Sequence, residues 1–307
     1  MERVELAGLG TEMRNPCTMD LDKMTPVEII SAMNREDGKV VEAVKEILPQ
    51  VAEIITWTTD SLRRGGRVIY IGAGTSGRLG VLDAVECPPT FGVTDQEVIG
   101  LMAGGERAFV KAVEGAEDDE AQGGRDLEQV GLTSRDTVIG LTASGRTPYV
   151  IGALRRARAE GCRTAAISCN CGAAVSALAD TAVEVNTGPE VLSGSTRLKA
   201  GTAEKMILNM ISTASMVGMG KVYQNLMVDV RQTNQKLVCR AQDIVMQAVG
   251  CTRDEASQAL RETGGEAKTA VVKLLLDIDA ASAQALLDRA DGRVRQVLDA
   301  YHREKEA

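Results

Sequence analysis

Residues 67–80 read RVIYIGAGTSGRLG, a short apolar run that ends in glycines and hydroxyl residues and then takes on helical spacing. This pattern indicates a buried strand, a tight loop and a helix over Gly77–Val85. Similar runs follow: EVIGLMAGG at 97–105, TVIGLTASG at 137–145, TAAISCN at 164–170 and TAVEVNTG at 181–188. Buried strands alternating with helices predict an α/β fold, a parallel sheet flanked by helices, in which ligands bind outside the carboxyl ends of the strands.

The pattern changes twice along the chain and divides it into three expected parts. An N-terminal helical segment covers 1–64, the sheet domain covers 65–235, and a small C-terminal helical unit covers 236–307. In the first part, Pro49 is expected to bend or interrupt the helical pattern. Further helices are expected over the ranges 107–119, 147–160, 195–219 and 229–249.

Composition excludes several classes of function. The 307 residues carry a net charge of −8, which argues against binding along nucleic-acid phosphates. Aromatic residues make up 2% of the chain, too few for platforms that stack bases or sugars. The single histidine, His302, lies in a charged tail, so a Ser-His-Asp triad or a multi-histidine metal site would have to be built around it.

The cysteines and the N-terminus indicate the compartment. The seven cysteines are irregularly spaced without a CxxC pair, which favours idle thiols in a reducing cytosol over disulfides or a metal site. The N-terminal residues lack the apolar stretch of a secretory signal, and no run is long enough to span a membrane. A soluble cytoplasmic protein is therefore expected.

The first glycine-rich loop has only half of a dinucleotide fingerprint. Gly72, Gly74 and Gly77 satisfy GxGxxG between a strand and a helix. The next strand ends in AGG rather than in an acid for the ribose hydroxyl, and the loop has arginine where a Walker A loop has lysine. Thr75 and Ser76, with backbone N–H groups at a helix N-terminus, predict a phosphate cradle instead.

A second hydroxyl-rich loop, TASGRTP at 142–148, ends a neighbouring strand and opens a helix. Either loop alone is explained equally well by a helix N-cap. Two such loops at adjacent strand ends favour a site for a small phosphorylated sugar. The substrate-binding residues expected in the two loops are Gly74, Thr75, Ser76, Ser144, Gly145, Arg146 and Thr147.

Without a usable histidine, carboxylates are the natural source of a general acid and a general base. Glu86 lies in DAVECPPTF, where two prolines are expected to stop the helix that leaves the first loop. Glu114 and Glu117 lie in AVEGAEDDE, on the helix expected at 107–119. Taken singly, each is explained better as an ordinary surface glutamate.

Four segments together resemble the N-acetylmuramic acid 6-phosphate etherases, which have the sugar isomerase (SIS) fold. They read GAGTSGRLGVLDAVECPPTFG, VEGAEDD, TASGRTPYV and GPEVLSGSTRLKAGTAEKMILNM, and the last also resembles a signature of glucokinase regulatory proteins. The resemblance covers nearly the whole chain, from TEMRN near residue 11 through the C-terminal helical unit. It implies that the sheet domain is a SIS phosphosugar-binding domain.

The resemblance implies a reaction that uses two carboxyl groups and neither a metal nor a redox cofactor. A base would remove the C2 proton of the open-chain sugar, D-lactate would leave C3, and water would add back to give N-acetylglucosamine 6-phosphate. The family's functional glutamates correspond to Glu117, the C2 base, and Glu86, which would protonate lactate and then activate water. Glu114 is the second candidate for the C2 base. Both roles require carboxyl pKa values nearer neutrality than usual, which burial in a closed site would provide.

The resemblance also assigns binding residues and an assembly. The residues that would hold the 6-phosphate are Ser76, Ser144 and Thr147, with Ser195, Arg197 and Lys199 as helpers. SIS proteins usually pair so that both subunits shape the site, so a homodimer acting in cell-wall amino sugar recycling is expected. Cys171 departs from the family pattern, which has proline there, and is far in sequence from both glutamates.

Other interpretations of the same loops stay open. A non-catalytic sugar-phosphate-binding regulator of the SIS family would not need the paired glutamates, and 307 residues leave little room for regulatory segments. An aldose–ketose isomerase would share the C2 proton abstraction but not the loss of a C3 substituent. A SIS transcription factor is disfavoured because no basic helix-turn-helix precedes the sheet. The C-terminal helices could be a dimer brace, a lid or a docking site.

Overall fold

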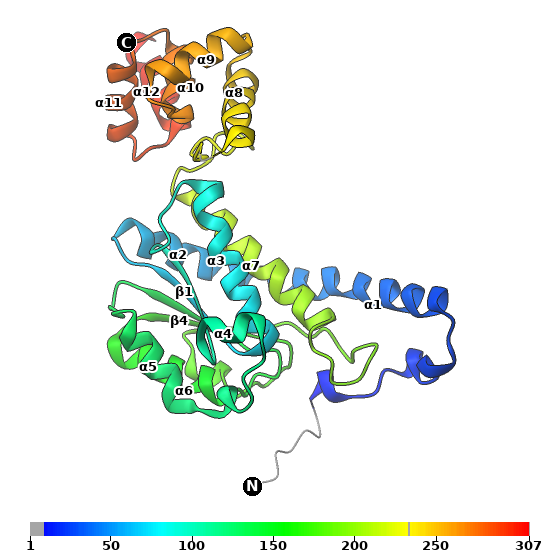
Figure 1. The fold of residues 1–307 in the computed structure, drawn as a ribbon. Coiled ribbons are helices and arrows are strands. Elements are labelled where there is room, and N and C mark those ends of the chain that lie inside the picture. The colour runs from blue at the N-terminus through cyan, green and yellow to red at the C-terminus, as the bar shows by residue number, and fades with distance from the viewer. Residues whose placement is uncertain (1–8, 233, 307) are drawn as a thin grey trace. The chain divides into compact units, whose positions relative to one another are not determined.

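The computed structural model of the chain describes residues 9–232 and 234–306 (Figure 1). The chain forms two compact units, Met1–Val85 with Gln96–Ser212 and Glu86–Asp95 with Thr213–Ala307. This division cuts through two long helices, whereas the expected parts end at 64 and 235. Residues 1–8 of the expected N-terminal segment lie outside the described residues.

The predicted parallel sheet is confirmed. Its five strands lie in the order β2-β1-β3-β4-β5, and every neighbouring pair is parallel. The strands are β1 (Val68–Gly72), β2 (Val98–Met102), β3 (Thr137–Leu141), β4 (Arg163–Ser168) and β5 (Thr181–Glu184). Gly72 pairs in register with Met102 on one side and Leu141 on the other. The loops that follow β1, β2 and β3 therefore start side by side at one edge of the sheet.

Helices cover both faces of this sheet. The helix α6 (Pro148–Glu160) packs on one face together with α5 (Glu120–Gln129), and the side chain of Val150 fills the space above Gly140. On the opposite face, α2 (Leu48–Arg63) joins the sheet through a hydrogen bond between the Ser61 and Thr137 hydroxyls. The helix α3 (Gly74–Phe91) approaches that face closely, because Gly80 meets the side chain of Tyr70.

The interruption expected near Pro49 is confirmed. A long N-terminal helix, α1 (Pro26–Glu46), ends at Ile47, and α2 begins at Leu48 with the proline in its first turn. A proline is tolerated there because the N–H group it lacks has no partner inside the helix. Figure 1 shows α1 extending away from the sheet. Three short 3₁₀ turns precede α1: η1 (Gly10–Glu12), η2 (Pro16–Thr18) and η3 (Leu21–Lys23).

Two expected helix boundaries were wrong. The helix α3 continues through both prolines and ends at Phe91, because they lie in its last turns and Gly92, at φ 70°, supplies the left-handed residue that closes it. The helix expected at 107–119 is instead α4 (Gly105–Val110), a loop and the 3₁₀ turn η4 (Ala116–Asp118). Gly115, at φ 73°, breaks the helical path there.

The long helix α7 (Lys199–Gly218) begins later than the expected Ser195, because the Glu190 carboxylate accepts hydrogen bonds from the backbone N–H groups of Lys199 and Ala200. Between β4 and β5 lies the short turn η5 (Ser176–Leu178). No helix in the described ranges is both long and apolar enough to cross a membrane.

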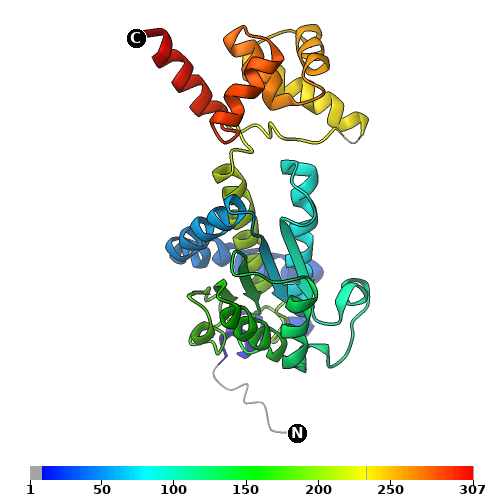
Figure 2. The same cartoon turned by 90° about the vertical axis from the view of Figure 1, so that its left-hand side faces the viewer.

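The second unit is helical, as predicted. Its helices are α8 (Gln235–Val249), α9 (Arg253–Glu262), α10 (Ala267–Leu276), α11 (Ala280–Arg289) and α12 (Val294–Glu306). The first of them starts at Gln235 rather than near 229, because the Asn234 side chain caps it. A shared apolar core includes Val245 and Val271, both fully buried. Figure 2 shows the end of α12 leading away from the other helices of this unit.

Candidate active site

The first glycine-rich loop brings the start of α3 directly against the end of β1. A Cβ atom on Gly77 would lie 2.7 Å from the Gly72 carbonyl oxygen, and one on Gly72 would lie 2.9 Å from the Gly77 nitrogen. Only glycine fits both positions. The free N–H groups of the first helical turn, at Gly74 to Ser76, therefore lie at the carboxyl edge of the sheet, where a phosphate would benefit from the helix dipole.

The second loop gathers hydroxyl groups at the start of α6. Thr142 Oγ1 lies 2.8 Å from Thr147 Oγ1 and 3.2 Å from Ser144 Oγ. Although Thr147 occupies the N-cap position, its side chain caps no backbone N–H group. Gly145, at φ 76°, turns the loop, and the Arg146 N–H donates to Ser144 Oγ. The structure thus brings Ser144 and Thr147 together, and the N-cap explanation does not account for the Thr147 hydroxyl.

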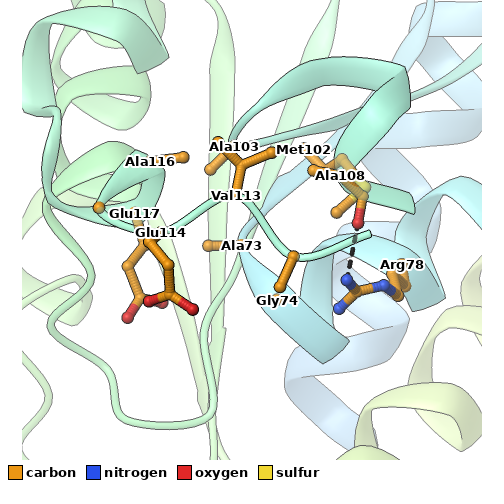
Figure 3. Close-up of a pocket in the computed structure, with 12 residues that line it drawn as sticks. Ala73, Gly74, Arg78, Met102, Ala103, Ala108, Val113, Glu114, Ala116 and Glu117 are labelled. Atoms are coloured by element: carbon orange, nitrogen blue, oxygen red, sulfur yellow. Dashed lines mark hydrogen bonds between the residues drawn. The ribbon is translucent and has the colours of Figure 1, made fainter. Parts of the chain in front are cut away.

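A pocket opens between the ends of β1 and β2 and the loop that carries Glu114 and Glu117 (Figure 3). Its lining residues are Ala73, Gly74, Arg78, Met102, Ala103, Ala108, Ala112, Val113, Glu114, Gly115, Ala116 and Glu117. In Figure 3 the two glutamate side chains point the same way, and Gly74 is drawn between them and Arg78. The pocket therefore joins a pair of carboxylates to the first phosphate loop.

Arg78 holds the wall of this pocket in place. Its Nε donates to the Phe109 carbonyl oxygen at 2.9 Å, and its Nη2 donates to that of Ala108 at 2.6 Å. These carbonyls belong to the last turn of α4, where they lack helical partners. The arginine that stands in place of a Walker A lysine thus ties α3 to the helix before the Glu117 loop.

Glu86 lies further along α3 than the first loop and is not among the residues that line the pocket. Glu86, Glu114 and Glu117 are all exposed to solvent. A second surface must therefore cover these carboxyl groups before they can act in a dehydrated site.

The expected helper residues Ser195, Arg197 and Lys199 differ in their exposure to solvent. Ser195 is half-buried and Arg197 is exposed in the turn before α7. Lys199 is 1% exposed, and its Nζ donates to Glu36 Oε2 at 2.8 Å. Its ammonium group is thus engaged in a buried ion pair, and its expected role as a substrate helper stays a prediction.

The Glu36–Lys199 ion pair ties α1 to α7. Burial opposes ionisation of Glu36, but hydrogen bonds from Lys199 and Lys39 outweigh it and lower the Glu36 pKa to about 2. Because this pKa lies below its unfolded value, the pair stabilises the fold above about pH 4.5. That stabilisation is lost progressively as the pH falls from about 4.5 through 2.

We predict that Lys199→Met lowers the free energy of unfolding of the unit that contains Glu36 and Lys199 by about 3–5 kcal/mol, because it leaves Glu36 buried without its partner. The matched control is Lys39→Met, since Lys39 also bonds Glu36 but is 61% exposed. The control should cost less than about 1 kcal/mol. Urea unfolding at pH 7 measures both variants, and equal losses would contradict the assignment.

Two buried contacts at the site escaped the sequence analysis. The Asn170 side chain donates to the Ala143 carbonyl at 2.9 Å and to the Thr11 hydroxyl at 3.0 Å, which braces the second loop against the N-terminal segment. Ser76 Oγ donates to Glu204 Oε1 at 2.8 Å. Glu204 lies four residues after Ala200 and four before Leu208. This helical spacing puts it on an apolar helix face, and that pattern is the sequence signal from which its burial could be predicted.

Comparison with known proteins matches this arrangement to a family. Residues 46–158 fit the profile of the glucokinase regulatory protein N-terminal SIS domain. The chain is 55% identical over 297 residues to the N-acetylmuramic acid 6-phosphate etherase of Mycolicibacterium smegmatis, covering 97% of this chain and 100% of that one. The chain belongs to the N-acetylmuramic acid 6-phosphate etherase family. An etherase of Serratia proteamaculans is 56% identical over 295 residues, with 96% and 99% coverage.

Membership of the etherase family confirms the resemblance and the SIS fold predicted from the sequence. The SIS profile covers residues 46–158, which include the first glycine-rich loop, the loop that carries Glu114 and Glu117, and the second hydroxyl-rich loop. The segment from Gly188, which reads GPEVLSGSTRLKAGTAEKMILNM, and the C-terminal helical unit fall within the near full-length match to the etherases. In the described residues no cluster of three or more His, Cys, Asp or Glu side chains is arranged to hold a metal ion.

Proposed function

We propose that this enzyme cleaves the D-lactyl ether of N-acetylmuramic acid 6-phosphate and releases D-lactate and N-acetylglucosamine 6-phosphate. The observation that carries the proposal is the 53–56% identity, over nearly the whole chain, to relatives that bear the etherase name. The glutamate pair in the pocket supports a catalyst over a regulator, because sugar-phosphate binding alone does not need carboxylates beside the anion.

The two hydroxyl-rich loops would hold the 6-phosphate. Ser76 and the free N–H groups of α3 face it from one loop, and Ser144 and Thr147 face it from the other. Hydroxyl and N–H donors at two helix N-termini suit a phosphate dianion. With the phosphate fixed there, the sugar carbons extend toward the pocket that Glu117 lines.

The proposed reaction is an elimination followed by a hydration. The Glu117 carboxylate takes the C2 proton, the C2–H electron pair forms the C2=C3 double bond, and the C3–O bond breaks. Glu86 protonates the departing lactate oxygen. Water deprotonated by Glu86 then adds to C3, and a proton returns to C2. No electrons are gained or lost overall, so the enzyme would be a carbon–oxygen lyase that needs no redox cofactor.

A homodimer would complete this site. The helix α1 exposes an apolar stripe made of Val27, Ile30 and Val41, which are 56–68% exposed. Their spacing places them on one helix face, as expected of a surface that another chain covers. Because Glu86 is not among the residues that line the pocket, we propose that a second chain supplies Glu86 to each pocket.

Proton NMR of the enzyme with N-acetylmuramic acid 6-phosphate in D2O tests the proposed function. We expect D-lactate to be released and deuterium to appear at C2 of the N-acetylglucosamine 6-phosphate formed. Exchange at C2 with lactate still attached would indicate an isomerase. Binding of the sugar phosphate without either change would indicate the non-catalytic regulator.

A further inference from the structure

Glu204 is a fully buried acid that the proposed reaction does not use. Its Oε1 lies 2.8 Å from Ser76 Oγ, and its exposed fraction is 0%. Its other oxygen, Oε2, has no hydrogen-bond partner in the part of the chain that the structure describes. An ionised carboxylate here would place charge on an oxygen without a donor, which is costly away from water. A neutral carboxylic acid avoids that cost.

The surroundings of Glu204 also disfavour its ionised form. The other titratable groups on the elements around it are Cys169, Glu190, Lys199 and Lys205, together with Arg78 and Asp83 of α3. Arg78 is bonded to the α4 carbonyls, and Asp83 accepts hydrogen bonds from Asn209 and Ser212. Cys169 is a buried thiol, Lys199 is paired with Glu36, and Lys205 is exposed. No ion pair to Glu204 forms among residues 9–232 and 234–306. Burial raises the pKa of Glu204 to about 7, and the hydrogen bond from Ser76 only partly opposes this.

We propose that Glu204 is a positioning residue that carries a proton and donates it in a hydrogen bond to Ser76 Oγ, which frees the Ser76 hydroxyl proton for the phosphate of the substrate. A serine hydroxyl has one proton to donate. While Glu204 is ionised, Ser76 donates that proton to Glu204 Oε1, and only its lone pairs face a phosphate. Once Glu204 is protonated, its own O–H makes the bond and the Ser76 proton can turn to the anion.

This inference rests on the proposed function, because it takes Ser76 as a phosphate ligand. Its consequence is that phosphosugar affinity falls as the pH rises and Glu204 loses its proton. If only the protonated form binds well, affinity should drop about tenfold between pH 6 and pH 8. The phosphate group of the sugar also changes its ionisation over part of this pH range. The pH dependence of the wild-type affinity must therefore be compared with that of a variant in which residue 204 cannot titrate.

Glu204→Gln is that variant, because the glutamine amide donates to Ser76 Oγ at every pH. Calorimetric titration with N-acetylglucosamine 6-phosphate from pH 6 to pH 8 should show the ratio of wild-type to Glu204→Gln dissociation constants rising about tenfold. In Glu204→Ala no carboxylate takes the Ser76 proton, so the wild-type pH dependence of binding should be lost there too, with kcat changed less than about threefold.

Glu190→Gln is the matched control, because Glu190 is also buried but lies before α7 and caps the first backbone N–H groups of that helix. It should keep the wild-type pH dependence of binding. A flat ratio of wild-type to Glu204→Gln affinities would overturn the proposal, as would a Glu204→Ala variant that keeps the wild-type pH dependence of binding. Failure of the wild type to bind the sugar phosphate at any pH would instead count against the proposed function.

Discussion

Glu117→Gln is expected to lower kcat for lactate release about a thousandfold while leaving the affinity for N-acetylglucosamine 6-phosphate within about threefold. The substitution keeps the shape of the side chain in the pocket but removes the oxygen that would accept the C2 proton. Deuterium exchange at C2, followed by NMR in D2O, should disappear together with lactate release. Loss of lactate release with full C2 exchange would assign Glu117 to the leaving group instead.

Glu114→Gln is the matched control for this prediction. Glu114 lies in the same loop, lines the same pocket and is exposed like Glu117, and their side chains point the same way (Figure 3). If Glu117 is the base, the Glu114 variant should keep kcat within about tenfold of the wild type. A thousandfold loss in the Glu114 variant, with an active Glu117 variant, would move the role of the base to Glu114.

The sheet and its loops could be predicted because local sequence determines them. Runs such as VIYIG are too short and too apolar for a surface helix, and the Gly72–Gly77 spacing is imposed by the contact of two backbones. The loop around Glu117 was predicted less well. Its residues favour a helix locally, but the backbone is extended at Lys111 and left-handed at Gly115, and the sequence pattern reveals neither change.

Charged residues near the site were harder to interpret, because residue type does not say whether a charge faces water or a buried partner. Lys199 looked like a phosphate ligand, but Ala203 and Ile207 follow it at helical spacing and both are buried. That spacing places Lys199 on the core face of α7. Its partner Glu36 is 163 residues away, so no local pattern could identify the pair.

A mixture of two inactive variants is expected to regain activity if two chains share each site. Glu86→Gln and Glu117→Gln homodimers should each turn over about a thousandfold more slowly than the wild type. A mixed dimer would contain one site with both glutamates intact and one with neither. After random exchange half of the dimers are mixed, so lactate release should recover to about a quarter of the wild-type rate.

The mixing experiment distinguishes a site that takes Glu86 and Glu117 from two different chains from a site that takes both glutamates from one chain. If both glutamates came from the same chain, every site in the mixture would lack one of them, and the rate would stay near that of the separate variants. The control is a mixture of Glu117→Gln with the double variant Glu86→Gln/Glu117→Gln, which contains no intact site under either arrangement. Recovery that depends on exchange time and is absent from this control would place Glu86 of one chain and Glu117 of the other on the same sugar.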